Sequence, residues 1–521
     1  MIVFLAFQNF VSAQKLNLEL KFSSNQKCFL ESSATVADID NNGTDEAVIS
    51  SQEELIAVGK TGNSIWRWKA KGRFMTYPAI LKRSGNVALI YAADYSGKLN
   101  CLDGNGKVVW QADLNAGSEW SASVIADLDG NGSYEVIQTD TKGTVWVFDA
   151  LTGAVLRKSS ISGLPVSPSV GDLNDDGKLE IALATNDGTI TVLGNDLAEL
   201  WKYKIGGFSE SWSTSAPVLF SASDGKNYLV AASSTGDIFC FDAKGKPVWQ
   251  YPTNVPVSSS ISVGDFDQNG QTDIFLITQT GLVYRFDENG TVIWKIDMQG
   301  RGLASGAIAD INNDGKMEYI LSTQTGHFLV LNQSGDVIFD YQLPSRSINV
   351  TPSIGSITGN PDKLDLFLTG GESGQTYCFE SPATKKSLIQ WSSYRGNAQN
   401  TGSWFGLTKS DELRMVPQNL AWNKLLNGER IQFNISNPKP TNSPLKAAAI
   451  CISPDGAKNN AIANIYGKEG QLLLPLDFRL PGKYQFNWSL TSSEGKELLS
   501  GSREISVQAF ENDRALAKHS L

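Results

Sequence analysis

Histidine is nearly absent from this chain: His327 and His519 are the only two in 521 residues. A Ser-His-Asp triad or a histidine-rich zinc site needs histidine beside a nucleophile or among clustered ligands. His327 lies in an apolar run predicted to be a strand, and His519 is the third residue from the end of the chain. No glycine-rich loop ends in the Lys-Ser/Thr pair that cradles phosphates. We therefore predict no catalytic residues.

Cysteine is also scarce, with five residues in the chain. Cys101, Cys240 and Cys378 recur at the same place in a sequence repeat, in the contexts Asn-Cys-Leu, Phe-Cys-Phe and Tyr-Cys-Phe. Equivalent positions in different repeats lie far apart, so these three are predicted to be single buried thiols. Cys28 and Cys451 have no obvious mates, and no disulfide framework is expected.

Long apolar runs are missing, because no stretch approaches the roughly 20 residues that a membrane-spanning helix needs. Residues 1–13 form a shorter apolar run that ends in small residues before Gln14. This pattern predicts a signal peptide without a basic start, and hence a secreted, periplasmic or cell-surface protein. The alternative interpretation is a buried N-terminal strand.

Positive charge is in deficit, and the formal net charge is −10. This balance argues against nucleic acid and anionic membranes as partners. Five calcium ions would offset the deficit formally.

Five acidic loops of one design are the most informative feature that is present. Each has oxygen-bearing side chains at positions 1, 3 and 5, glycine at position 6 and a carboxylate at position 9, before an apolar strand. Such oxygens suit a hard cation such as calcium, in up to five structural sites. The predicted ligands are Asp38, Asp40, Asn42 and Glu46; Asp127, Asp129, Asn131 and Glu135; Asp172, Asn174, Asp176 and Glu180; Asp265, Asp267, Asn269 and Asp273; and Asp310, Asn312, Asp314 and Glu318.

The spacing of these loops defines a repeat. They start 89, 45, 93 and 45 residues apart, so the unit has about 45 residues and the two wider gaps each hold an extra unit. Short β-branched and aromatic runs between Gly, Asn and Asp turns give four strands per unit, which is typical of propeller blades. We predict an all-β chain with an eight-bladed β-propeller over residues 15–404. Lys15–Phe22 should supply the outer strand of the last blade, beside Tyr377–Phe379.

Each predicted blade ends on a bulky residue that keeps the repeat register. The segment from Trp391 to Gly402 is expected to close the propeller and begin a linker. The bulky residues are Trp66, Trp110, Leu156, Trp201, Trp249, Trp294, Phe339 and Trp391.

A different pattern follows the repeat. Alternating apolar and polar runs separated by Pro, Gly and Asp turns predict an immunoglobulin-like β-sandwich over residues 410–508. Its expected strands are 430–435, 447–452, 471–478, 482–490 and 504–507. The tail 509–521 reads as a possible helix start.

The acidic loops resemble those of the FG-GAP and VCBS repeat families, which include the integrin alpha propeller and hold calcium there. The Trp-ended hairpins and the segment from Tyr394 to Gly402 look more like PQQ-like, quinoprotein-type eight-bladed propellers. The adjacent cysteine pair common in quinone-dependent dehydrogenases is missing, so no PQQ is expected. An EF-hand is the competing interpretation of the loops, but position 12 lacks the bidentate Glu, and a strand follows instead of a helix.

Loops that join one blade to the next provide the predicted ligand surface, because aromatic faces beside Arg and carboxylate suit sugars or peptides. The alternative for the two tryptophans is packing between blades. Two functions stay open: an exported binding or scaffold module for a glycan or an extracellular protein, or a polysaccharide lyase similar to rhamnogalacturonan lyases, acting by calcium-assisted β-elimination. The surface residues are Arg73, Phe74, Tyr77, Glu119, Trp120, Glu210, Trp212, Arg301 and Arg346.

Overall fold

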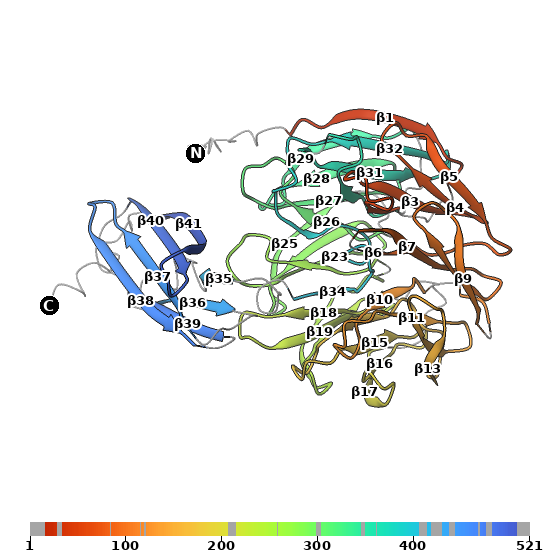
Figure 1. Ribbon diagram of the computed structural model, residues 1–521, viewed down its shortest axis with the longest axis horizontal. Coiled ribbons are helices and arrows are strands. Elements are labelled where there is room, and N and C mark those ends of the chain that lie inside the picture. The colour runs from red at the N-terminus through yellow and green to blue at the C-terminus, as the bar shows by residue number, and fades with distance from the viewer. Residues whose placement is uncertain are drawn as a thin grey trace, which may run out of the picture. The chain divides into compact units, whose positions relative to one another are not determined.

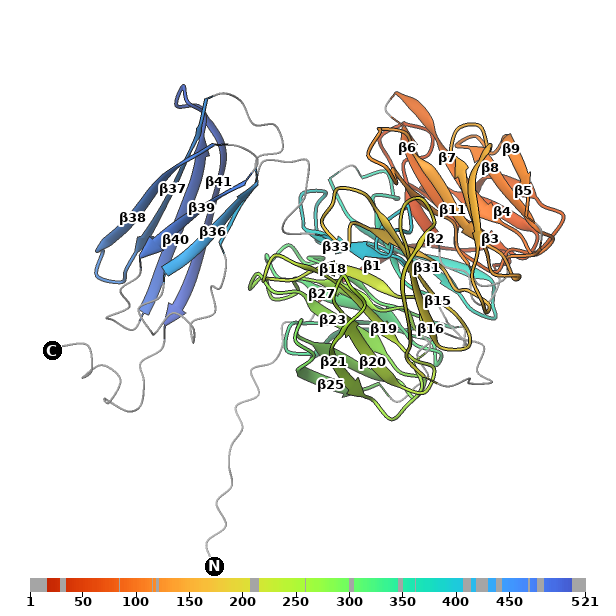
Figure 2. The same ribbon diagram turned by 90° about the horizontal axis from the view of Figure 1, so that it is seen from below.

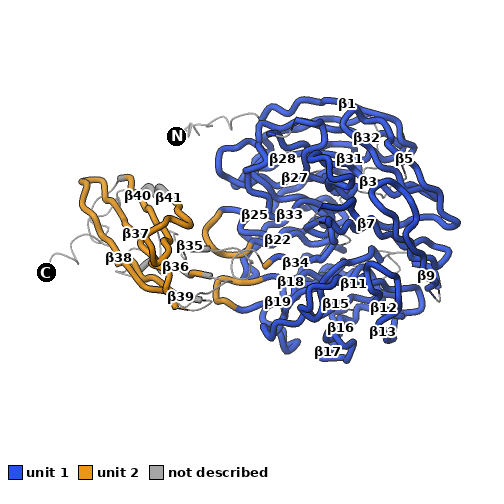
Figure 3. The backbone as a smooth tube through the Cα atoms, viewed as in Figure 1, with its two compact units in different colours: residues 1–220, 226–267, 273–404 blue, residues 221–225, 268–272, 405–521 orange. Residues whose placement is uncertain are grey.

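The computed structural model is all-β, and its chain divides into two compact units (Figure 3). Unit 1 comprises residues 1–220, 226–267 and 273–404, and unit 2 comprises 221–225, 268–272 and 405–521. The described part of the chain contains no helix suited to crossing a membrane. The structure describes residues 16–28, 34–83, 85–114, 116–118, 121–206, 215–257, 259–298, 304–344, 350–360, 362–405, 414–417, 430–436, 443–466, 469–475 and 482–507.

The first half of unit 1 folds into four antiparallel sheets, each made of consecutive strands (Figure 1). The first three strands of each are largely buried, whereas the fourth alternates between exposed and half-buried residues. The strands are β2 (Ala34–Ala37), β3 (Glu46–Ser51), β4 (Glu54–Val58) and β5 (Ser64–Lys69); β6 (Ala79–Arg83), β7 (Asn86–Ala93), β8 (Lys98–Asp103) and β9 (Val108–Asp113); β10 (Val124–Ala126), β11 (Glu135–Thr139), β12 (Thr144–Asp149) and β13 (Val155–Ser160); and β14 (Ser169–Gly171), β15 (Glu180–Ala184), β16 (Thr189–Leu193) and β17 (Glu199–Lys204).

The second half of unit 1 repeats this arrangement, and the described residues of unit 1 as a whole form eight sheets. Two of the later sheets gain a short fifth strand, β33 (Ile389–Trp391) or β34 (Ser403–Trp404). The other strands are β18 (Val218–Ser221), β19 (Asn227–Ala232), β20 (Asp237–Phe241) and β21 (Pro247–Pro252); β22 (Ser262–Gly264), β23 (Asp273–Ile277), β24 (Leu282–Phe286) and β25 (Val292–Asp297); β26 (Ala307–Ala309), β27 (Glu318–Ser322), β28 (His327–Leu331) and β29 (Val337–Gln342); and β30 (Ser353–Gly355), β31 (Asp365–Gly370) and β32 (Gln375–Glu380).

Unit 1 is built from sheets that pack one beside the next (Figure 2), and their first strands contact one another in the order expected for the blades of a propeller. The first strand β2 lies beside both β6 and β30, and β10 lies between β6 and β14. The last sheet takes its outer strand from the N-terminal side, because β1 (Glu19–Asn25) pairs with β32. Leu20 lies opposite Phe379 and Phe22 opposite Cys378, as the sequence predicts.

A contact between the outer strands repeats around unit 1. In five sheets, a tryptophan of the outer strand donates its indole N–H to a backbone carbonyl in the hairpin between the third and fourth strands of the next sheet. A glycine of that hairpin, with positive φ, lies against the same indole ring. A Cβ added at Gly153, for example, would lie 2.5 Å from the Trp110 ring. The donors and acceptors are Trp66 to Gly104, Trp110 to Ala150, Trp201 to Ala243, Trp249 to Glu288 and Trp294 to Gln333, at 2.9–3.1 Å.

The third sheet departs from this pattern, and it corrects the predicted register. Arg157, not Leu156, lies opposite Val147, the position that tryptophan takes elsewhere, and Leu156 is exposed. In the next hairpin Leu197 adopts φ +68°, where the other hairpins have glycine. Arginine and leucine thus take the two places where five other pairs of neighbouring sheets have tryptophan and glycine.

Substituting Gly153 by alanine should lower the free energy of unfolding by about 3 kcal/mol, because the new methyl group meets the Trp110 ring at a residue with φ +71°. Gly85→Ala is the matched control, since its φ is +70° and nothing lies within 4 Å of an added Cβ. That variant should lose only about 1 kcal/mol. Urea unfolding of both proteins measures the difference, and equal losses would show that the ring contact contributes nothing.

The segment after the repeat corrects a second prediction. Residues 389–404 do not begin a linker but run across the first strands of several sheets. Trp391 belongs to β33, which pairs with β26, and not to an outer strand. Backbone carbonyls of this segment accept N–H groups at each crossing: Ile354 to Ser392, Ile80 to Ala398, Ile125 to Gln399, Val170 to Thr401 and Leu219 to Gly402.

The side chains of this crossing segment fill the centre of the propeller. Trp391, Arg395 and Asn400 are each at most 1% exposed. Asn400 Nδ2 donates to the carbonyls of Pro78 and Ser123, which precede two neighbouring first strands. Residues 389–404, called the axle below, therefore hold the sheets together through hydrogen bonds to their first strands.

Unit 2 is a pair of antiparallel sheets with one apolar core. One sheet has the order β35-β36-β39 and the other β38-β37-β40-β41. Phe433, Leu474, Ala447 and Phe486 are buried in the core that the two sheets share. The strands are β35 (Arg414–Pro417), β36 (Arg430–Ser436), β37 (Leu445–Ile452), β38 (Lys458–Ile465), β39 (Glu469–Pro475), β40 (Gly482–Thr491) and β41 (Glu497–Val507).

Candidate metal centres

The five acidic loops share one backbone conformation, and each joins the first strand of a sheet to the second. Positions 4 and 6 have positive φ in every loop, and position 6 is always glycine, such as Gly43 at φ +91°. The buried carboxylate at position 9 accepts the N–H of the apolar residue at position 2. These bonds join Ile39 to Glu46, Leu128 to Glu135, Leu173 to Glu180, Phe266 to Asp273 and Ile311 to Glu318, at 2.7–3.1 Å.

Three of the loops bring their carboxylates into one cluster. In each, ligand oxygens from positions 1, 3 and 9 lie within 4.8 Å of one another. The position 5 side chain also accepts the backbone N–H of position 7, as Asn42 does from Thr44 at 2.8 Å. The clusters are Asp38, Asp40 and Glu46; Asp127, Asp129 and Glu135; and Asp265, Asp267 and Asp273.

The other two loops have asparagine at position 3, and their amides turn toward the position 9 carboxylate. Asn174 Nδ2 donates to Glu180 and Asn312 Nδ2 donates to Glu318, both at 3.0 Å. A cation at these loops requires each amide to rotate so that its oxygen replaces its nitrogen. The position 5 residues Asp176 and Asp314 are exposed and accept the N–H of Lys178 and Lys316.

Burial and mutual repulsion perturb the carboxylates at position 9. Burial, reinforced by the neighbouring loop carboxylates, raises the pKa of Glu46 and of Glu180 to about 7 and that of Glu318 to about 8. The pKa of Glu135 is raised for the same reason. A bound divalent cation would relieve this repulsion.

In the loop Asp265–Asp273, the carboxylates are paired with the positively charged side chain of Arg285 from the neighbouring strand β24. Arg285 Nε donates to Asp273 Oδ1 at 2.8 Å, and Arg285 Nη2 donates to Asp267 Oδ2 at 2.7 Å. The arginine side chain is 4% exposed, and its guanidinium also lies over the ring of Phe266. Arg285 was not among the predicted site residues, although an arginine inside an otherwise apolar strand is a visible signal in the sequence.

Strand direction separates the acidic loops from the predicted ligand surface. Successive strands are antiparallel, so the turn between the first and second strands lies at one end of each sheet. The connection from the fourth strand to the next sheet lies at the opposite end. The loops for a metal and the loops for a ligand therefore lie on opposite faces of the propeller.

Only part of that predicted surface can be placed. Arg73 is exposed, and the rings of Tyr77 and Tyr394 pack at an interplanar angle of 43° with centroids 3.9 Å apart. Phe74 is 2% exposed and packs beside Trp68 in the core. Six further predicted residues lie outside the described part of the chain, as do the predicted signal peptide 1–13 and the tail 509–521. The six are Glu119, Trp120, Glu210, Trp212, Arg301 and Arg346.

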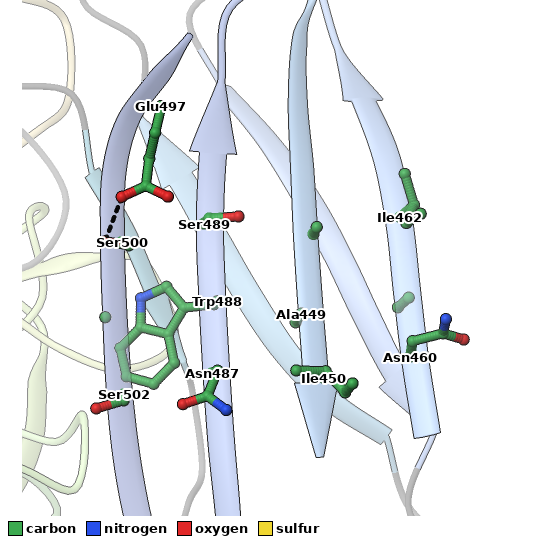
Figure 4. Close-up of a pocket in the computed structure, with 13 residues that line it drawn as sticks. Ala449, Ile450, Asn460, Ile462, Asn487, Trp488, Ser489, Glu497, Ser500 and Ser502 are labelled. Atoms are coloured by element: carbon green, nitrogen blue, oxygen red, sulfur yellow. Dashed lines mark hydrogen bonds between the residues drawn. The ribbon is translucent and has the colours of Figure 1, made fainter. Parts of the chain in front are cut away.

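Unit 2 carries a separate open hollow of about 670 Å³ on the sheet β38-β37-β40-β41 (Figure 4). Asn460 and Ile462 of β38 lie on one side of it, and Ser500 and Ser502 of β41 on the other. Glu497 is its one charged lining residue, and Ser500 donates a hydrogen bond to it at 2.7 Å. This lining holds no group of titratable side chains, so we assign no chemistry to it.

Two solved propeller structures of natural proteins are similar to this chain, and both likenesses concern the fold. BamB from Moraxella catarrhalis is 17% identical over 71% of this chain and 98% of its own, with a TM-score of 0.50. A europium-containing methanol dehydrogenase is 12% identical over 70% of this chain and 93% of its own, also with a TM-score of 0.50.

The computationally designed protein Ika8 matches to the same extent, at 13% identity over 70% of this chain and 99% of its own, with a TM-score of 0.50. No curated protein matches the sequence. None of these findings supports the lyase alternative.

The family described as outer membrane protein assembly factor BamB matches residues 51–162 and 186–416. These segments cover more than half of the chain and include most of the sheets around the axle. The PQQ-like half of the predicted resemblance is thereby confirmed, whereas the FG-GAP and VCBS resemblance of the loops stays a prediction. The chain is a β-propeller protein that belongs to the BamB family.

Proposed function

We propose that this protein is an exported, calcium-stabilised, eight-bladed propeller that serves as a scaffold for a protein ligand. The eight sheets of unit 1 would be its blades, with β1 closing the ring. Unit 2 would be an immunoglobulin-like domain that acts as a spacer or a second contact. Membership of a family described as an outer membrane protein assembly factor supports both a protein partner and a location in the cell envelope.

The filled axis is the observation that carries this proposal. Many propellers could bind a small molecule in the central channel, but here Trp391, Arg395 and Asn400 take up that space. A ligand must then bind on a face or on the rim. Flat faces built from many loops are suited to proteins, whereas small molecules are bound in concave pockets.

The face with the sheet-to-sheet connections is the proposed docking face. It carries the exposed Arg73 and the half-buried Tyr77, whose ring packs at a tilt against that of Tyr394. Arginine and tyrosine are enriched at the centres of protein interfaces. A glycan remains the competing ligand, since aromatic rings also bind sugars.

Calcium would stabilise the opposite face through the acidic loops. Two carboxylate clusters support this assignment, because carboxylates held within 4.8 Å of one another repel unless a cation lies between them. They are Asp38, Asp40 and Glu46, and Asp127, Asp129 and Glu135.

Site-specific crosslinking tests the docking face. A photoreactive amino acid replaces Arg73 on the proposed face or Asn105, in an exposed hairpin on the acidic-loop face, and the full-length protein is irradiated in cells that express it. We expect one protein to crosslink at position 73 and not at position 105. The purified partner should then bind the wild type, and Arg73→Glu should weaken that binding at least tenfold.

Equal crosslinking at both positions would contradict the docking face. Binding to a glycan array by the wild type, lost in Tyr77→Ala but without any protein crosslink, would replace the protein ligand by a sugar.

A further inference from the structure

The loop Asp265–Asp273 differs from its four counterparts at two places. At position 9 it has Asp273, where the other loops have glutamate. In the neighbouring strand it has Arg285, opposite Phe275, the residue two places beyond position 9. The same register position in the other four sheets holds Ala57, Val147, Val192 and Val330.

These two differences fit each other sterically. Aspartate is one methylene shorter than glutamate, and the guanidinium takes the room that is left, with N–O distances of 2.7 and 2.8 Å to Asp267 and Asp273. Arg285 Nη1 also donates to the carbonyl of Gln333 at 3.2 Å in the hairpin of the next sheet. The guanidinium thus binds the carboxylates at positions 3 and 9, which are two of the three that cluster in the loops starting at Asp38 and Asp127.

Because Arg285 is buried, its charge needs a compensating partner inside the sheet. Its position lies in the core of the sheet and is apolar in the four counterparts, and an unpaired charge there would be strongly unfavourable. A guanidinium is compensated only where carboxylates are already present. Those carboxylates likewise need a positive charge, which a metal or an arginine can supply.

We propose that Arg285 is the resident cation of the loop Asp265–Asp273, so that this loop takes no metal while the four other acidic loops each bind one calcium ion. The inference rests on the proposed calcium sites and sets their number at four. It also means that removal of the guanidinium opens a fifth site. The chain thereby keeps one loop of the propeller ordered when calcium is scarce.

Hydrogen exchange of the full-length wild type, with 5 mM calcium or with chelator, tests this directly. Calcium should slow exchange at least tenfold in peptides spanning 38–46, 127–135, 172–180 and 310–318, and should leave 265–273 unchanged. Slowing at 265–273 to the same extent would overturn the proposal and leave the calcium role intact. No change at any of the five loops would instead overturn the calcium role itself, and the proposal with it.

The variant Arg285→Val/Asp273→Glu gives this loop the residues found in its counterparts, with Asp273→Glu alone as the control. The double variant should bind five calcium ions per chain by equilibrium dialysis, where the wild type binds four. Its thermal midpoint should fall in chelator and recover in calcium. A double variant that binds no additional ion would overturn the proposal, and the hydrogen exchange result decides if the variant does not fold.

Discussion

Removing calcium should lower the free energy of unfolding of the propeller by about 6–11 kcal/mol relative to the protein in 10 mM calcium. A site that holds an ion at 10 to 100 times its dissociation constant contributes about 1.4–2.7 kcal/mol, and oxygen cages of extracellular modules bind at about 10⁻⁴–10⁻³ M. Four such sites give the total. Urea unfolding followed by tryptophan fluorescence, with calcium or with chelator, measures the difference.

The stabilisation by calcium should depend on pH, and the raised pKa values of the loop carboxylates set the direction of that dependence. In the metal-free protein, the pKa values of Glu46 and Glu180 are raised to about 7 and that of Glu318 to about 8. The unfolded chain ionises these groups near pH 4.5, so the folded state without metal loses stability as pH rises from about 5 to 8. Calcium replaces the lost protons and should therefore stabilise more at pH 8 than at pH 5.5.

Magnesium at the same ionic strength is the control for these measurements. It demands a smaller octahedral cage and gives up its water reluctantly, so it should recover less than half of the calcium effect. A calcium effect below about 1 kcal/mol at pH 8, or one that shrinks as pH rises, would contradict the assignment of the loops as metal sites.

Substituting Arg395 by alanine should lower the free energy of unfolding by about 3–5 kcal/mol, through lost hydrogen bonds and a cavity at the axis. Arg395 is fully buried, and its Nη2 donates to the carbonyls of Pro168 and Pro217 at 3.2 and 3.0 Å and to the Ser169 hydroxyl. These acceptors belong to the first strands of two neighbouring sheets or directly precede them. Without the guanidinium, three buried oxygens lose a donor.

Arg395→Met separates charge from packing in this prediction. Burial lowers the pKa of Arg395 to about 10, so the side chain is still charged at neutral pH. Methionine fills most of the space and removes the cost of burying that charge, so it should lose about 2 kcal/mol less than alanine. Arg73→Ala, at an exposed arginine, should change stability by less than 0.5 kcal/mol. A loss below 1 kcal/mol for Arg395→Ala would show that the axle is held by its backbone alone.

Repetition made most of the propeller predictable from the sequence. A 45-residue period, hairpin glycines and β-branched runs each report local geometry, and each recurs often enough to be recognised. Even the closing strand β1 was visible, because its alternating pattern needed a partner and the last sheet lacked one strand. Unit 2 has no repeat, and its strands β35 and β38 were not predicted, since β38 has an exposed, asparagine-rich face with little apolar signal.

Register within a repeat is harder to predict than the repeat itself. A shift of one residue moves a side chain to the other face of a strand, and Leu156 and Arg157 are adjacent in the sequence. Apolar character favoured Leu156, but the pairing of β12 with β13 places Arg157 at the tryptophan position.

The sequence by itself determined the class of fold, the period and the loops that present oxygen ligands, because these depend on residues close together along the chain. Tertiary structure alone decided the roles of Arg285 and Arg395. Arg285 lies 12 residues from Asp273 and 18 from Asp267, and Arg395 lies 178 residues or more from the oxygens to which it donates. Strand pairing and the crossing segment bring these groups together, and a buried charge takes its meaning from the neighbours that the fold supplies.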